Sequence, residues 1–182
     1  LTMASSLVLG MGLPTAAAYI LVATLTAPAL VSMGVDLMAA HMFVFYSAML
    51  SSITPPVALA AFAAAAICRE PPMRVAMISV KFGFVAFLLP YFFVLEPRLL
   101  GMGGIGETVG VFAMAVVGVL SLACVLQGYA FGKLTTLSRI VIGIAALAVL
   151  MPDLKFKLIG IAAILAVLAA WKIGQFTKSN QN

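Results

Sequence analysis

The sequence predicts an all-α integral membrane protein, and three observations support that class. First, 65% of the residues are apolar and only 8% are charged, whereas a soluble domain usually carries about 25% charged residues. Second, the apolar residues form long runs, and residues 1–35 and 37–68 contain no Asp, Glu, Lys or Arg. Third, runs of about 18 or more apolar residues are typical of transmembrane helices. A soluble fold of 182 residues could not cover so much apolar surface.

Several other classes of protein do not fit the composition. The net charge of +5 comes from Lys and Arg scattered at the ends of apolar runs, so we expect no nucleic-acid partner. Cys68 and Cys124 form no CxxC pair, and they predict neither a metal site nor a disulfide framework. The chain contains no P-loop and no GxSxG motif. We therefore expect no enzymatic activity, no ATP-driven step and no cofactor.

The first apolar run, residues 1–33, is expected to form two helical arms joined near residues 10–14. Gly10, Gly12 and Pro14 are poor residues for a helix interior. Thr15 can begin the second arm directly after the proline. Because the chain starts with a leucine inside this run, we expect it to be the C-terminal part of a longer membrane protein.

The second run, residues 37–68, contains the stretch LSSITPPV at positions 50–57. As one straight helix the run would measure about 48 Å at about 1.5 Å per residue, which exceeds a hydrocarbon core of about 30 Å. Pro55 and Pro56 interrupt it near the middle. Two structures fit: a re-entrant hairpin, or a single crossing made of two half-helices with an unwound centre. Unwound backbone in a membrane must be covered by protein or water, so both place a site at residues 51–57.

The rest of the chain is expected to contain spans at about 75–95 and 108–130. Two shorter segments, at about 140–151 and 158–171, would form a hairpin around residues 152–157. The regions 69–81 and 133–139 and the C-terminal tail hold seven basic residues and one acidic residue, whereas the two intervening loops hold three of each. The positive-inside rule therefore places the first set, with the C-terminus, in the cytoplasm.

A broken helix can bind ions, because its two half-helix ends carry partial charges within the membrane. Ser51, Ser52 and Thr54 add hydroxyl oxygens to the unwound carbonyls, a set of hard ligands suited to Na⁺. The helix end at Pro55 and Pro56 is expected to present backbone N–H groups to a carboxylate. The alternative interpretation is a kinked helix whose hydroxyls only bond to freed backbone groups.

Three stretches of the chain resemble the second half of the large permease subunit of tripartite ATP-independent periplasmic (TRAP) transporters. They are GMGLPTAAAYILVATLTAPAL at 10–30, GVDLMAAHMFVFYSAMLSSITPPVALAAFAAAAI at 34–67 and FLLPYFFVLEPRLL at 87–100. The AHMFVFY and ITPPVALAAFAAA sequences resemble the fused type, in which small and large membrane subunits form one chain that works with TAXI-type binding proteins. The resemblance implies a transport region at 1–100 and additional C-terminal helices of unknown function at 101–182.

The resemblance implies an elevator-type secondary transporter in a bacterial or archaeal inner membrane, with Na⁺ as the coupling ion. A periplasmic solute-binding protein would deliver a small-molecule carboxylate. An N-terminal half and a small subunit, fused to this chain, would complete the permease within the lipid bilayer. This chain would form the second inverted repeat, with a re-entrant hairpin tip at residues 10–14 and a discontinuous helix at residues 51–57.

The resemblance also implies particular site residues around the two breaks. The sodium site of the family corresponds to Gly10, Ser51, Thr54 and Val57, the last through its carbonyl. The remaining residues of the breaks are the candidates for substrate binding: Gly12, Pro14, Thr15, Ser52, Pro55 and Pro56. No arginine lies in this stretch, so a residue that pairs with an anion would come from the N-terminal half.

Two other functions remain open on the residues alone. A proton-coupled carrier or a channel would need a polar path, and His41 is the only histidine in the chain. A membrane anchor or assembly subunit would need no particular residues, but it would also have no need of helix breaks at 10–14 and 51–57.

Overall fold

The computed structural model describes residues 1–130, 132 and 134–179, with side chains up to residue 167. All regular elements in this part of the chain are helices, and it contains no β-strand. The predicted all-α class is therefore confirmed. The chain forms two compact units, Leu1–Leu100 and Gly101–Asn182. How function divides between residues 1–100 and 101–182 stays a prediction.

Two helices of the described residues are long and apolar enough to cross a membrane, α2 (Thr15–Ser32) and α7 (Ile105–Gln127). Helix α5 (Pro72–Phe82) and the stretch Phe84–Leu95 form a third candidate span if the bent pair is counted as one. These helices support a multi-pass membrane protein.

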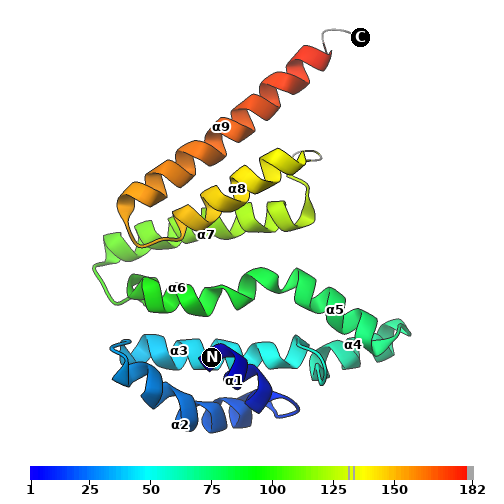
Figure 1. Ribbon diagram of the computed structural model, residues 1–182, viewed down its shortest axis with the longest axis vertical. Helices are drawn as coiled ribbons and strands as arrows, with labels where there is room; N and C mark the ends of the chain where they lie inside the picture. Colours follow the sequence, from blue (N-terminus) through cyan, green and yellow to red (C-terminus); the bar gives the residue numbers. More distant parts are fainter. Residues whose placement is uncertain (131, 133, 180–182) are drawn as a thin grey trace. The chain divides into compact units, whose positions relative to one another are not determined.

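The first two apolar runs are interrupted where the sequence predicted. Helix α1 (Thr2–Gly10) and helix α2 are joined by the turn at residues 11–14. Helix α3 (Leu37–Leu50) continues into a 3₁₀ turn, η1 (Ser51–Ile53), and α4 (Leu59–Cys68) begins after a five-residue gap. Figure 1 shows α3 and α4 following one another along the first unit, so the second run is two half-helices rather than a hairpin.

Helix α3 lies at the centre of the first unit. Its start is fixed by Asp36, whose carboxylate accepts hydrogen bonds from the N–H groups of Met38 at 2.8 Å and Ala39 at 3.3 Å, an N-cap arrangement. Helix α3 packs against α1, α2 and α6 (Leu89–Leu95). Small residues let these helices approach closely in a membrane protein, and the core between α2 and α3 is rich in them: Ala18, Ala23, Ala27, Ala40 and Ala48.

The third apolar run, predicted as a span at about 75–95, is bent rather than straight. Helix α5 ends at Phe82, a 3₁₀ turn η2 (Phe84–Phe87) follows, and the axis bends by 65° before α6. A Cβ at Gly83 would lie 2.8 Å from Cδ1 of Ile53 and 3.1 Å from the Ser79 carbonyl oxygen, so the bend and η1 are in close contact. Pro90, in the first turn of α6, has no N–H with which to continue a helix from the bend. The unit ends with the 3₁₀ turn η3 (Pro97–Leu100).

The second unit consists of α7, α8 (Thr136–Val149) and α9 (Leu154–Ser179). Two expectations for this unit were wrong, namely the loop at 152–157 and a short last helix at 158–171. The Asp153 carboxylate accepts a hydrogen bond from the Lys155 N–H at 3.0 Å, so α9 begins inside the predicted loop. The predicted orientation, with a cytoplasmic C-terminus, rests partly on Lys133, Lys172 and Lys178, which lie outside the residues whose side chains are described.

Candidate functional site

The turn between α1 and α2 is compact because one glycine takes a conformation that other residues avoid. Gly12 has φ of +77°, in the left-handed region that favours glycine. The N–H groups of Met11 and Leu13 donate to the carbonyls of Val8 and Gly10 at 3.3 and 3.4 Å. Pro14 precedes the first residue of α2, so the two arms form a helical hairpin with a four-residue tip.

The break between α3 and α4 follows from the two prolines. Pro55 and Pro56 lack the N–H groups that would bond to the carbonyls of residues 51 and 52 in a continuous helix. The Ser51 carbonyl accepts instead from the Thr54 N–H at 3.2 Å, and the Thr54 carbonyl accepts from the Ala58 N–H at 3.2 Å. The bond between the prolines is cis, and Ala58 has φ of +31°. The chain is therefore unwound from Thr54 to Ala58.

The hairpin tip and the break meet through Ser51. Its hydroxyl, in a residue that is only 3% exposed, lies 2.9 Å from the Gly10 carbonyl oxygen and 2.6 Å from that of Ala48. A Cβ on Gly10 would lie 2.9 Å from the Ser51 Oγ and 3.2 Å from the Ala48 oxygen. Glycine at position 10 is thus required for this contact between two segments 41 residues apart.

The other expected site residues lie around this contact. A Cβ on Gly12 would lie 3.5 Å from Cγ1 of Val57, so a second point of the tip faces the break. The Thr54 hydroxyl donates to the Leu50 carbonyl at 2.7 Å, and the Ser52 hydroxyl donates to the Met49 carbonyl at 2.8 Å. These two bonds stay within the broken segment. The last four expected residues lie in the same two segments, with Pro14, Thr15 and Pro56 exposed and Pro55 half-buried.

One detail of the expected anion site was wrong. Proline has no backbone N–H, and α4 begins at Leu59 rather than at Pro55 or Pro56. Within α4, the first N–H group with a backbone acceptor is that of Phe62, which donates to the Ala58 carbonyl at 2.9 Å. The N–H groups that a helix start leaves free for an anion are therefore those of residues 59–61.

The chemistry of the two breaks is neutral and based on oxygen. Both segments lie in runs without a charged side chain, and within the described residues no three His, Cys, Asp or Glu side chains gather as they would around a metal ion. The hydroxyls of Ser51 and Thr54 donate to carbonyls, but each hydroxyl oxygen keeps lone pairs that can face a cation. Unwound carbonyls and half-helix ends are the groups that coordinate Na⁺ in transporters with broken helices.

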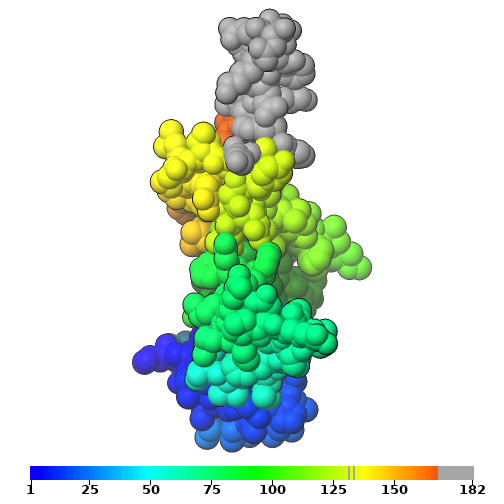
Figure 2. All heavy atoms as spheres, turned by 90° about the vertical axis from the view of Figure 1, so that its right-hand side faces the viewer, coloured from blue at the N-terminus to red at the C-terminus, as the bar shows by residue number. Residues whose placement is uncertain are grey.

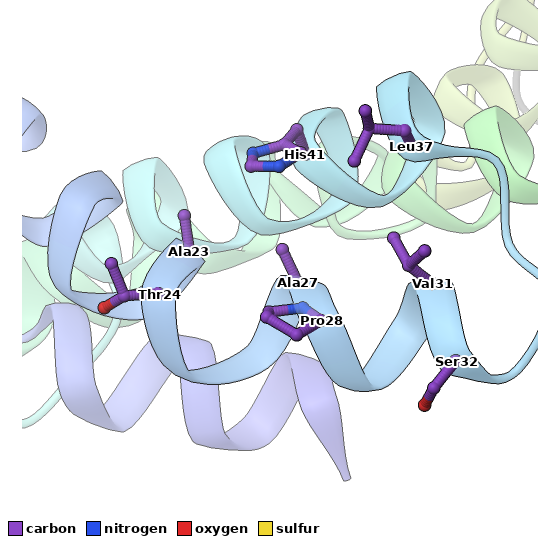
Figure 3. Close-up of a pocket in the computed structure, with 8 residues that line it drawn as sticks. All are labelled: Ala23, Thr24, Ala27, Pro28, Val31, Ser32, Leu37 and His41. Atoms are coloured by element: carbon purple, nitrogen blue, oxygen red, sulfur yellow. The ribbon is translucent and has the colours of Figure 1, made fainter.

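His41 belongs to a different place in the unit. Its Nδ1 lies 2.9 Å from the Tyr19 hydroxyl, and it borders a cavity of about 560 Å³ between α2 and α3. Figure 3 shows His41 and Leu37 on α3 facing Ala23, Ala27 and Pro28 on α2. Ten residues of helix, about 15 Å at about 1.5 Å per residue, separate His41 from Ser51. We did not expect this cavity from the sequence.

Comparison with known proteins gave a match that covers the first unit. The family described as "Tripartite ATP-independent periplasmic transporter, DctM component" matches residues 1–102. These residues include both breaks, the bend at Gly83 and the whole of the first unit. No curated protein and no solved structure gave a match.

Proposed function

Because the chain belongs to the DctM family of tripartite ATP-independent periplasmic transporter components, we propose that it forms part of a sodium-coupled permease for small organic acids. The family makes it a component of membrane transport rather than an enzyme. Family membership also implies that a periplasmic binding protein works with the permease. We extend this proposal to a fused permease with a TAXI-type binding protein, an elevator mechanism, an inner-membrane location and a cytoplasmic C-terminus.

The observation that carries the proposal is the buried contact between Ser51 and Gly10. This contact joins the hairpin tip at residues 10–14 to the helix break at residues 51–57, the two segments in which the sequence predicted a broken helix. Hydroxyl and carbonyl oxygens from both segments lie close together at this contact. We assign the sodium site to Gly10, Ser51, Thr54 and the Val57 carbonyl. The substrate carboxylate would lie next to it, near Gly12 and Ser52 and the free N–H groups at the start of α4.

Thr54 offers the sharpest test, because its hydroxyl bonds to a backbone carbonyl of its own segment. Thr54→Ala should remove an ion ligand while the protein still inserts, whereas Thr54→Ser should keep it. Thr26→Ala is the matched control, since the Thr26 hydroxyl makes the same type of bond to the Val22 carbonyl at 2.8 Å on α2, away from the break.

The permease that contains this chain would be reconstituted in proteoliposomes with its binding protein and labelled organic acids. Uptake would be measured against sodium concentration, with potassium as the replacement. We expect Thr54→Ala to raise the sodium concentration for half-maximal uptake, and Thr54→Ser and Thr26→Ala to leave it near the wild-type value. Equal sodium curves for Thr54→Ala and the wild type would remove Thr54 from the site. Uptake that ignores sodium and follows a pH gradient would favour a proton-coupled carrier, and His41 would then be the residue to change.

A further inference from the structure

Helix α5 carries basic and large apolar side chains together on its exposed face. Arg74 and Lys81 are seven residues apart, so at about 3.6 residues per turn they lie on one stripe, separated by about 10 Å along the axis. Large apolar residues flank that stripe on both sides, with Met77 59%, Ile78 44% and Phe82 69% exposed. The opposite face is covered, because Ala76 is fully buried in a cluster with Ala58 and Ala61 of the α4 segment.

This mixture does not suit a helix that crosses a membrane straight. If α5 continued Phe84–Leu95 as one straight helix across the membrane, Lys81 would lie about 13 Å deeper in the membrane than Pro72, at about 1.5 Å of rise per residue. That depth is close to half of a hydrocarbon core about 30 Å thick. A charged, lipid-facing side chain there is strongly unfavourable.

The bend at Gly83 changes the depth of Lys81. With Phe84–Leu95 along the membrane normal, α5 is inclined by 65° to that normal. Lys81 then lies only about 6 Å deeper than Pro72, using about 1.5 Å of helix rise per residue. A lysine side chain can cover such a distance with its apolar stem in the acyl region and its ammonium group among the headgroups.

We propose that α5 is an interfacial helix and that Arg74 and Lys81 bind the phosphates of anionic lipid headgroups. Apolar residues on both sides of the basic stripe enter the acyl region, as in other helices that lie in the interface. The core of a protein interface, in contrast, is poor in lysine, so a lipid surface fits this face better than a protein partner. Figure 2 shows the chain around residues 60–80 at the surface that faces the viewer.

The nearby charges leave this face basic. Glu70 forms an ion pair with Arg74 at 3.0 Å, but both side chains are largely exposed, and exposed pairs of this kind are weak. The pair occupies one of the five guanidinium N–H donors of Arg74. Arg69, in the turn before α5, adds a further positive charge. Together Arg69, Arg74 and Lys81 outnumber the single carboxylate of this region.

The first test measures depth in the assembled permease. A fluorophore would be placed at Met77→Cys in a background of Cys68→Ser and Cys124→Ser, in nanodiscs of phosphatidylcholine with or without phosphatidylglycerol. Quenchers at different depths along the acyl chain would then be compared. We expect the strongest quenching from the shallowest quencher. Strongest quenching from the deepest one would overturn the proposal, and so would the absence of quenching by any lipid, because a protein would then cover α5.

The second test counts bound lipid. Phosphatidylglycerol retained by the permease would be measured by native mass spectrometry for Lys81→Gln, for Arg74→Gln and for the control Lys155→Gln, which removes an exposed lysine at the start of α9. A basic residue near an anionic surface contributes about fivefold in affinity. We expect about that loss for each α5 variant and none for the control. Equal retention in Lys81→Gln and Lys155→Gln would refute the proposal, and so would full competition by millimolar inorganic phosphate, which would indicate a site for a soluble anion.

Discussion

Gly10→Ala tests whether the hairpin tip and the helix break are held together as the structure indicates. A methyl group at this position would lie 2.9 Å from the Ser51 Oγ, 3.2 Å from the Ala48 carbonyl oxygen and 3.3 Å from the Ser51 Cβ. One of these neighbours is backbone, and the other is a buried side chain whose single hydroxyl proton is shared between the Gly10 and Ala48 carbonyl oxygens. Neither can move without breaking a bond, so the tip and the break would have to separate.

Two opposing effects decide the size of the change. Alanine is a better helix former than glycine by about 0.5–1 kcal/mol, and Gly10 is the last residue of α1. Overpacking a close contact costs about 1–3 kcal/mol, and the loss of the Ser51–Gly10 hydrogen bond adds about 0.5–1.5 kcal/mol. We therefore expect the free energy of unfolding to fall by about 0.5–4 kcal/mol.

The measurement is equilibrium unfolding by denaturant in detergent micelles, with Gly110→Ala as the control. Gly110 lies inside α7, and a Cβ there meets nothing within 4 Å. The free energy of unfolding of this control should therefore rise by about 0.5–1 kcal/mol from helix propensity alone. If Gly10→Ala is stabilised as much as Gly110→Ala, the contact at Ser51 does not exist as described.

Three further changes test the packing around the site and in the second unit. Gly160→Ala would place a Cβ 2.5 Å from the Ala145 carbonyl oxygen, so we expect a loss of about 1–3 kcal/mol and separation of α8 from α9, detected by loss of crosslinking between cysteines placed on the two helices. Asp36→Ala removes the N-cap of α3 and should lower the free energy of unfolding by about 1 kcal/mol, whereas Asp36→Asn should retain most of it. Tyr19→Phe removes the hydrogen bond to His41 but keeps the ring against Phe45. This change should lower the free energy of unfolding by about 0.5–1.5 kcal/mol and leave sodium-dependent uptake unchanged. A lost sodium response would place His41 in the coupling mechanism.

Local chemistry made the helix breaks predictable. Pro55 and Pro56 remove two backbone donors whatever surrounds them, and Gly12 and Pro14 mark a turn by their own conformational preferences. The start of α9 also has a signal in the sequence, because Asp153 directly before Leu154 is a typical N-cap residue, although we expected a loop there. Errors of this kind concern where an element begins rather than whether it exists.

Contacts between distant segments could not be predicted in the same way. No residue near Gly83 in the sequence predicts the 65° bend, because a single glycine is tolerated inside a helix. At the bend, Gly83 lies against Ile53, thirty positions earlier in the chain. The pairing of Gly10 with Ser51 is likewise a property of the folded unit, and the resemblance to a family suggested it where the residues alone did not.

The short turn η1 therefore connects the candidate site to two neighbours at once. Ser51, its first residue, is bonded to the hairpin tip, and Ile53, its last residue, fills the space beside Gly83 at the bend of α5. Tightly packed contacts of this kind move together rather than deform independently. If sodium binds at the break as we propose, a movement of η1 on binding would also be transmitted to the hairpin tip and to the bend. Gly83→Ala, which places a methyl 2.8 Å from the Ile53 side chain, should change the sodium dependence of uptake although it lies outside the site. An unchanged sodium curve in a correctly folded Gly83→Ala permease would show that the break works without the bend.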